Sequence, residues 1–276
     1  MTRRQPFSSL PAWSATDLAG DPHDAADKGL RVRRMFGSIA HRYDLNNRLH
    51  SFGRDQAWRR RAVQLCNVTP SDHVLDAACG TGDLTEAFAV AGAASVCGVD
   101  FTVQMLDIAR LKAARRRPAT RQRLSYKLSD VMALPFDDAS FDIVSIAFGI
   151  RNVTDAGGAL RELGRVLRPG GRIMVLEFSQ PANRVLRALN RVYCEQVMPV
   201  TATLLAGDRS GAYRYLPRSV STFAGREALR ALIEEAGFER ISQHPMTFGV
   251  CVASLGVKPR SPDLTLSGRE AAESVR

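Results

Sequence analysis

The sequence predicts an α/β fold with a seven-stranded, mostly parallel sheet, and three observations lead to this prediction. Short apolar runs alternate with amphipathic stretches from about residue 74 to 178, as they do in consecutive strand–helix–strand units. The first of these runs leads directly into glycines, where a doubly wound sheet makes its ligand-binding turn. Near the C-terminus two apolar runs follow each other with no helix between them, which predicts one antiparallel strand.

The expected elements follow in chain order. Residues 32–66 have a helical pattern with interruptions, so we expect an N-terminal helical cap before the sheet. The expected strands cover residues 74–77, 94–99, 124–128, 141–148, 172–178, 239–244 and 248–255. The expected helices cover 84–90, 105–114, 159–167 and 226–236, and Pro169-Gly170-Gly171 is a typical breaker after the third of them.

The two ends of the chain are expected to lie outside the fold. Arginines and serines in residues 1–31 suggest a transit peptide, but Asp17, Asp21, Asp24 and Asp27 argue against one, because such peptides are poor in acids. We therefore expect a disordered leader at 1–31, a single domain at 32–258 and a flexible tail at 259–276.

Charge and cysteine content restrict the function classes. The net charge of +10 favours polyanions or anionic membrane surfaces. Residues 110–127 carry eight basic side chains and no acid, but only one aromatic, so a solvated surface is expected rather than a nucleic-acid site. The five cysteines have no metal-ligand spacing, which predicts no metal, no disulfides and a cytoplasmic location. No apolar run approaches the roughly 18 residues of a membrane span.

The segment VLDAACGTGDLT, residues 74–85, places Gly80 and Gly82 between a strand and a helix. Glycines there let the backbone approach a ligand, although a tight turn alone explains them too. A dinucleotide site requires glycine or alanine where Thr85 stands. Asp76 and Asp83 flank the loop and would repel a pyrophosphate, whereas the sulfonium and ammonium groups of S-adenosylmethionine would be attracted.

Two later strand ends carry acids as well. Asp100 follows Gly80 by about 20 residues, where a carboxylate can accept hydrogen bonds from ribose hydroxyls. One strand later, Asp130 can take an adenine amino group and Val131 can pack on the ring. Each acid alone is also explained as a strand-end cap. Together the three strand ends predict a class I SAM-dependent methyltransferase (Rossmann-like) fold with S-adenosylmethionine as methyl donor.

The chain resembles the ubiquinone/menaquinone biosynthesis C-methyltransferase family from about residue 32 to 258. The resemblance is carried by the segments MFGSIAHRYDLNNRLHSFGRDQAWRR, LDAACGTGDLT, ALPFDDASFD, FGIRNVTD, RVLRPGGRIMVLEFSQP, YRYLPRSVSTF and AGFERISQHPMTFGVCVASLGVK. FGIRNVTD with LEFSQP separates this family from methyltransferases at large.

The resemblance implies methyl transfer to a ring carbon of a prenylated hydroquinone. Because no mitochondrial leader is convincing in the sequence, demethylmenaquinol is preferred over the ubiquinone precursor. The resemblance also implies that Thr81, Asp100, Asp130 and Val131 contact the donor. A further family contact falls on Ala147, where many members carry serine, so no hydroxyl is available there.

The acceptor chemistry points to FGIRNVTD. Methylation of the ring carbon needs loss of a hydroxyl proton and a cation to stabilise the phenolate. Arg151 is suited to this role because a guanidinium keeps its charge, and a water would relay the proton. Asn152 is expected to orient Arg151, and Asp155 is equally well placed to cap the next helix.

Further polar residues are expected to line the acceptor pocket: His41, Tyr43, Asn47, Tyr213 and Tyr215. A helical insertion at 184–225 should contribute to the same pocket. Within it, Arg184, Arg187 and Arg191 share one face of an amphipathic helix, which predicts either ordinary packing or peripheral contact with an anionic membrane surface at its inner face.

Three alternatives stay open: the equivalent C-methylation in ubiquinone biosynthesis, a nucleic-acid methyltransferase, and a non-catalytic scaffold. The basic charge motivates the second, but the chain lacks an N/D-P-P-aromatic tetrad after the fourth strand. We expect no nucleic-acid partner, and a homodimer is a further expectation.

Overall fold

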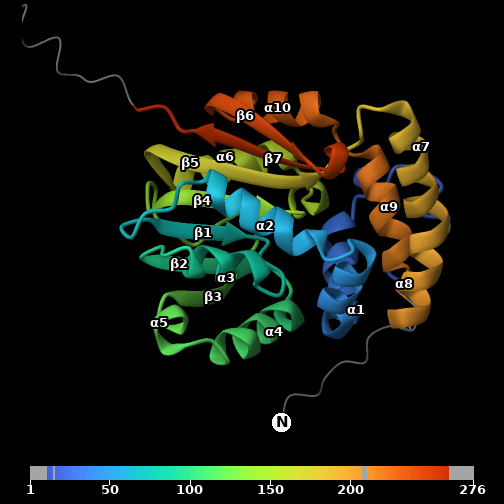
Figure 1. Cartoon of the computed structure of the whole chain (residues 1–276), viewed down its shortest axis with the longest axis horizontal. Coiled ribbons are helices and arrows are strands. Elements are labelled where there is room, and N and C mark those ends of the chain that lie inside the picture. Colours follow the sequence, from blue (N-terminus) through green and yellow to red (C-terminus); the bar gives the residue numbers. More distant parts are fainter. Residues whose placement is uncertain (1–10, 15, 207–209, 261–276) are drawn as a thin grey trace, which may run out of the picture.

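The computed structural model describes residues 11–14, 16–206 and 210–260. Its centre is a seven-stranded sheet in the order β3-β2-β1-β4-β5-β7-β6 (Figure 1). The strands are β1 (His73–Ala77), β2 (Ser95–Asp100), β3 (Leu124–Leu128), β4 (Phe141–Ala147), β5 (Leu167–Phe178), β6 (Glu239–Met246) and β7 (Cys251–Val257). The first five strands are parallel, and β7 runs antiparallel to both β5 and β6. The predicted fold is confirmed.

The helices of the described chain cover both faces and one end of this sheet. They are α1 (Lys28–His50), α2 (Arg54–Leu65), α3 (Asp83–Val90), α4 (Val103–Ala114), α5 (Pro118–Arg121), α6 (Ala156–Val166), α7 (Arg184–Val192), α8 (Met198–Ala206), α9 (Ala212–Thr222) and α10 (Arg226–Glu235). Short turns of helix are η1 (Pro22–Asp24), η2 (Ile150–Asn152), the π-helical η3 (Tyr193–Val197) and η4 (Thr247–Gly249). None of the described helices is both long and apolar enough to cross a membrane.

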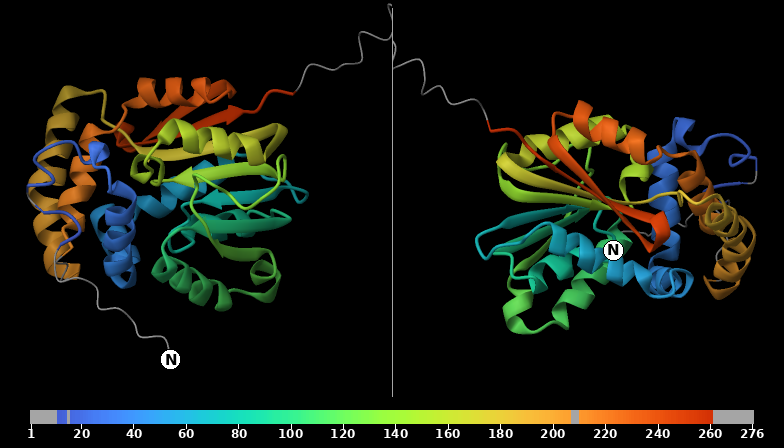
Figure 2. Two further views of the ribbon diagram at one scale, coloured as in Figure 1. Left: turned by 180° about the vertical axis from the view of Figure 1, so that it is seen from behind. Right: turned by 45° about the horizontal axis from the view of Figure 1, so that its top comes forward.

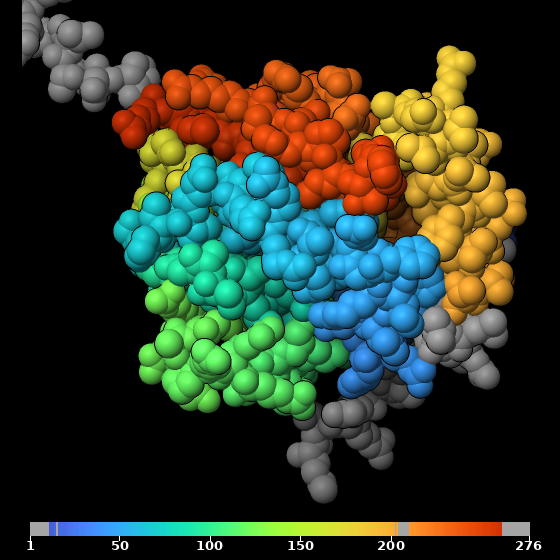
Figure 3. Space-filling view, viewed as in Figure 1, coloured from blue at the N-terminus to red at the C-terminus, as the bar shows by residue number. Residues whose placement is uncertain are grey.

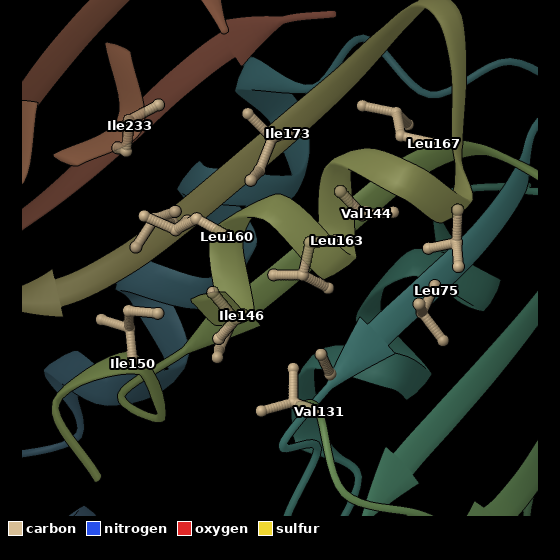
Figure 4. Close-up of a cluster of buried hydrophobic side chains, with 14 of the residues drawn as sticks. Leu75, Val131, Val144, Ile146, Ile150, Leu160, Leu163, Leu167, Ile173 and Ile233 are labelled. Carbon is tan, nitrogen blue, oxygen red and sulfur yellow. The ribbon is translucent and has the colours of Figure 1, made fainter. Parts of the chain in front are cut away.

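A separate apolar core holds the helices to each face of the sheet. On one face α6 and α10 pack on β4 and β5 through side chains such as Leu160, Leu163 and Ile233 (Figure 4). On the other face Trp58 of α2 and Phe88 of α3 pack on the same central strands. Figure 2 shows the sheet enclosed between these two layers. The sheet is therefore rigid at the carboxyl ends of its strands, where loops can carry polar groups.

Helices α1 and α7–α9 gather at that carboxyl end of the sheet (Figure 1). The expected cap and the expected helical insertion are the α1–α2 pair and the α7–α9 group. The cap begins at Lys28, four residues earlier than expected.

The prediction of a disordered leader is wrong for residues 11–14 and 16–31. Trp13 is buried and stacks on Tyr215 of α9 with ring centroids 4.6 Å apart. Lys28 is buried as well, and its ammonium donates to the carbonyl of Val153 at 2.6 Å. Charge had suggested exposure here, but these segments cover α1 and α9, which would otherwise expose apolar surface. Residues 1–10 of the expected leader and 261–276 of the expected tail lie outside the described residues.

The strand β5 starts earlier than its sequence predicted. Pro169, Gly170 and Gly171 lie within it, and its register with β4 shifts between the pairs of Phe141 and Ile143. A bulge accommodates the breaker residues at the start of the strand, where proline needs no ladder donor.

Candidate active site

Two adjoining cavities lie at the carboxyl ends of the strands. The first, which we call the strand-end cavity, is lined by residues that follow β1 to β4, including Gly80, Asp100, Asp130, Val131 and Ala147. The second, the helical cavity, has a volume of about 460 Å³ and lies between the α1–α2 pair and helices α7 to α9. Tyr43 and Phe148 line both. The two cavities therefore share part of one wall.

Carboxylates provide the charged side chains of the strand-end cavity. Asp100 is buried, and its two oxygens accept hydrogen bonds from the backbone N–H groups of Gly80 and Thr102 at 2.9 and 2.8 Å. Burial raises the pKa of Asp100, while these donors act in the opposite direction. Asp130 is exposed and accepts from the Met132 N–H. Among the described residues no lysine or arginine lines this cavity.

Asp76 lies behind the cavity rather than in its wall. Its carboxylate accepts from the hydroxyls of Thr85 at 2.7 Å and Ser145 at 2.9 Å. Burial raises the pKa of Asp76 to about 6, although both hydroxyls oppose the rise. Asp76 therefore ties β1, β4 and α3 together beneath the glycine loop.

The other loop residues also form the support of the strand-end cavity. Gly82 has a φ of 84°, and a Cβ there would lie 2.7 Å from the Tyr126 hydroxyl, so only glycine fits. Thr81 donates to Asp44 of α1 at 2.5 Å. Asp83 pairs with Lys112 of α4, and the same ammonium reaches Asp44 at 2.8 Å. This cluster fastens α1 over the loop.

Arg151 lines the helical cavity and is held by two hydrogen bonds from one nitrogen. Its Nη1 lies 2.6 Å from Oε1 of Glu177 and 2.9 Å from the carbonyl oxygen of Phe148. Both side chains of the ion pair are buried, and the guanidinium lies over the ring of Phe178. Burial raises the pKa of Glu177, while the Arg151 charge opposes that rise. The second Glu177 oxygen and Arg151 Nε have no partner among the described residues.

The join between the cavities is a strained turn after β4. Phe148 has a φ of 56°, a left-handed conformation that is costly for an aromatic residue. Ala78, after β1, has a φ of 50°. A Cβ added to Gly149 would lie 2.7 Å from the Ala78 side chain, so this glycine permits the two strand ends to approach. Such strain occurs where a structure over-determines a local geometry, as active sites do.

Asn152 faces the strand-end cavity and is held at both ends of its amide. Its Nδ2 donates to the Phe148 carbonyl at 3.1 Å, and its Oδ1 accepts from the Tyr215 hydroxyl at 3.0 Å. Arg151 donates to Glu177 and to the Phe148 carbonyl, so Glu177, rather than Asn152, holds its guanidinium in place. Asp155 caps α6 by accepting from the Gly158 N–H, as predicted.

The residues expected around the acceptor are only partly brought together. Tyr43 lines both cavities and Asn47 lines the helical cavity. Tyr213 and Tyr215 are buried and line neither; Tyr213 contacts Asn46 of α1 at 2.8 Å. His41 is exposed and lines neither cavity. Tyr213 and Tyr215 therefore support the wall of the site without lining it.

Sequence reasoning missed Glu177 and Phe148. Glu177 stands in an otherwise apolar strand, the LEF of LEFSQP, and a lone acid there was the available signal. In the sequence Phe148 looks like the last core residue of the fourth strand, and nothing in the pattern predicts its left-handed backbone conformation. Among the residues that the structure describes, no cluster of three or more His, Cys, Asp or Glu could hold a metal.

Comparisons with known proteins agree with this geometry. Residues 24–258 match the model of the ubiE/COQ5 methyltransferase family. A demethylmenaquinone methyltransferase of Thermus thermophilus is 47% identical over 82% of this chain and 100% of its own length. One of Deinococcus radiodurans is 42% identical over 85% of this chain and 95% of its own.

A ubiquinone/menaquinone biosynthesis C-methyltransferase UbiE of a Geobacter species is 40% identical over 84% of this chain and 98% of its own length. Among solved structures, a SAM-dependent methyltransferase of Thermotoga maritima superposes with a TM-score of 0.57. It covers 82% of this chain and 99% of its own, at 20% identity, and so supports the fold.

Proposed function

Because the chain belongs to the ubiE/COQ5 methyltransferase family, we propose that it methylates a ring carbon of demethylmenaquinol, giving menaquinol. It is a SAM-dependent methyltransferase, with S-adenosylmethionine as donor. The names of the relatives at 47% and 42% identity favour demethylmenaquinol as substrate. The equivalent step of ubiquinone biosynthesis is the second candidate, because relatives at 40% identity are named for both quinones.

The observation that carries the proposal is the difference in charge between the adjoining cavities. The strand-end cavity offers Asp100 and Asp130 and suits a donor with a sulfonium and an ammonium group. The helical cavity offers Arg151 beside aromatic rings and suits a ring that becomes a phenolate. Since the two cavities meet at Tyr43 and Phe148, the methyl group would pass between them there.

The residues present fit the donor. Asp100 would accept from the ribose hydroxyls, Asp130 from the adenine amino group, and Val131 would pack on the adenine ring. Gly80 allows close approach of the backbone, and Ala147 offers an apolar contact without a hydroxyl. The bound donor supplies a methyl group activated by its attachment to cationic sulfur.

Arg151 would stabilise the acceptor. In our mechanism the hydroquinone hydroxyl releases its proton to a water, and the guanidinium balances the resulting phenolate charge. The adjacent ring carbon forms the bond to the methyl group as the bond from methyl to sulfur breaks. That carbon then loses its hydrogen as a proton to water, which restores the aromatic ring.

Glu177 would act through Arg151 as a positioning residue. Its carboxylate and the Phe148 carbonyl fix the same Nη1, so the guanidinium has little freedom to turn. Asn152 would shape the donor side of the strained turn, with Tyr43 forming the wall that the two ligands share.

A prenylated substrate is taken from a bilayer, so we also propose that the protein contacts an anionic membrane surface peripherally. The excess of basic residues supports this partner over a neutral surface.

The test is incubation with isotopically labelled S-adenosylmethionine and each demethylated quinol, followed by mass spectrometry of the product ring. We expect label on the naphthoquinol ring, and Arg151→Ala should lower kcat by at least about 100-fold while donor affinity stays within about twofold. Label on neither ring would contradict the proposal. Full methyl transfer by Arg151→Ala would remove Arg151 from the chemistry.

A further inference from the structure

Helix α7 exposes both of its faces, and its polar face is the one that borders the helical cavity. No residue of α7 is buried. Arg184, Arg187 and Arg191 line the helical cavity. Val185 and Leu189, on the opposite face, are 67% and 62% exposed and do not line it. Soluble helices normally bury the apolar face, so something outside the chain is expected to cover this one.

Two exposed aromatic residues lie beside α7. Phe52, in the turn between α1 and α2, is 79% exposed, and its ring lies 5.9 Å from the ring of Tyr193, which lines the helical cavity. Phe248, at the tip between β6 and β7, is also 79% exposed, two residues before the cavity-lining Val250. The surface is hollowed where the tip, the α1–α2 turn and α7 approach one another (Figure 3).

The backbone at both phenylalanines is strained. Phe52 has a φ of 53° and Phe248 a φ of 58°. A left-handed residue that is not glycine costs of order 1 kcal/mol or more, and here the strain presents a large apolar ring to solvent. The described chain leaves both rings largely exposed, so burial in the core does not account for the strain. An external apolar phase that receives the rings would explain both.

We propose that Phe52, Phe248 and the outward face of α7 (Val185, Leu189 and Val192), together the apolar rim, insert into the surface of an anionic bilayer. The rim lies next to residues that line the helical cavity, so a lipid-borne ring could enter the cavity while its tail stays in the membrane. The docking deepens the peripheral membrane contact proposed above, and its benefit to catalysis rests on the proposed methyl transfer.

Charge favours a bilayer over a second copy of the chain. The three arginines lie on the side of α7 opposite the apolar face, at the depth where an in-plane amphipathic helix meets headgroup phosphates. Neither Arg184 nor Arg191 has an ion pair or hydrogen bond within the described chain, so both remain available to phosphate. Two copies meeting through α7 would instead bring together two surfaces of chains that each carry +10.

The test is flotation of the full chain with quinone-free vesicles, either rich in phosphatidylglycerol or made of phosphatidylcholine alone. The wild type should float with the anionic vesicles, and Leu189→Glu should lower that partition at least about tenfold. Leu111→Glu is the matched control, because Leu111 on α4 is also 62% exposed and lines neither cavity. We expect its partition to stay within about twofold of the wild type.

A second variant separates lost docking from misfolding. Phe52→Gly with Phe248→Gly relieves the left-handed strain, so its melting temperature should not fall while its vesicle partition does. Methyl transfer to a water-soluble quinol with a short tail should be retained by Leu189→Glu, and transfer to a long-tailed quinol in vesicles should fall.

Wild-type flotation by Leu189→Glu would overturn the proposal. So would a wild-type dimer that Leu189→Glu converts to a monomer with unchanged vesicle partition, because the rim would then bind a second copy. Failure of methyl transfer to every quinol, with docking intact, would count against the proposed function alone.

Discussion

Arg151 and Glu177 form a buried ion pair. Arg151 Nε and Glu177 Oε2 have no hydrogen-bond partner among the described residues. Such a pair is a poor source of stability, because two charges lose their hydration. Its value lies in presenting a fixed guanidinium to the helical cavity. The Glu177 carboxylate also offsets part of the positive charge that a phenolate would meet.

Glu177→Gln should therefore shift the pH dependence of methyl transfer. Removing the carboxylate leaves the Arg151 charge less compensated, so the hydroquinone hydroxyl ionises at lower pH and the acidic limb of the kcat profile moves down. Stability should fall by about 3 kcal/mol, because Arg151 is left unpaired. Initial rates across pH test the shift. Glu177→Asp keeps the charge, so the acidic limb of its kcat profile should stay in place. If the limb does not move in Glu177→Gln, Glu177 has only a structural role.

For Asp76 the prediction concerns the free energy of unfolding rather than the rate of methyl transfer. Burial raises its pKa from 3.8 to about 6, so the folded chain holds a proton where the unfolded chain has released it. Its contribution to stability is therefore largest at low pH and is lost as pH rises through 6. Asp76→Asn should be more stable than the wild type at pH 7 by up to about 3 kcal/mol.

Urea unfolding at pH 7 and at pH 4 measures this difference, which should nearly vanish at the lower pH. Asp142 is a control of opposite sign: burial alone would raise its pKa, but His73 N–H and Arg168 lower it, so Asp142→Asn should be less stable at pH 7. A destabilised Asp76→Asn at pH 7 would show that its hydrogen bonds outweigh its charge.

At the scale of elements, α1 is held over the glycine loop by Lys112. The ammonium pairs with Asp44 of α1 and with Asp83 of α3, and Arg48 of α1 also reaches Asp83 at 3.3 Å. Burial alone would raise the pKa of Asp83, but Lys112 and the neighbouring guanidiniums lower it, so the carboxylate is charged at neutral pH.

Lys112→Ala should loosen α1. It leaves Asp44 and Asp83 facing each other without their shared cation, and we expect amide exchange in α1 to accelerate about tenfold and donor affinity to fall. Hydrogen–deuterium exchange measures the first effect. Arg110→Ala, which removes the exposed pair with Asp107 on the same helix, is the control. Equal amide exchange in both variants would show that Lys112 does not hold α1 over the glycine loop.

Most elements were predictable because their apolar periodicity matches their environment. The strand after Val74 and the helix after Leu84 follow the ordinary patterns of buried strand and amphipathic helix, and the strand ends of Asp100 and Asp130 do converge on one cavity. The support residues were not separable from lining residues, because Asp76 and Asp83 have the same chemistry as Asp100. Only three-dimensional packing distinguishes them.

Helix α7 was predicted, but the direction of its faces was not. Periodicity gives the angle between Arg187 and Leu189 around the helix and contains nothing about which side meets the sheet. The ordinary expectation would bury the leucine, but the structure leaves both residues exposed, with Arg187 bordering the helical cavity.

At the scale of the whole molecule, the N-terminal segment belongs to the support of the site. Trp13 stacks on Tyr215, the Tyr215 hydroxyl donates to Asn152, and Asn152 donates to the Phe148 carbonyl at the strained turn. The contact joins residues 13 and 215, far apart in the sequence, so no local pattern could reveal it. The aspartates of residues 17–27, which argued against a transit peptide, give no information about this packing.

Trp13→Ala should therefore affect both stability and catalysis. Loss of a buried indole should lower the free energy of unfolding by about 3 kcal/mol, and the freed Tyr215 should lower kcat by a few-fold. Thermal unfolding and initial rates test this. Leu30→Ala, an exposed apolar residue in α1, is the control. A variant as stable and active as the wild type would show that the segment does not support the site.

The two cavities share only Tyr43 and Phe148 among their described lining residues. Apart from these two side chains the walls are formed by different residues, so we expect each ligand to enter and leave without waiting for its counterpart. The kinetic consequence is random-order binding: each product should compete only with the reactant whose chamber it leaves. If product release limits turnover, kcat would then equal the rate of the slower of the two product-release steps.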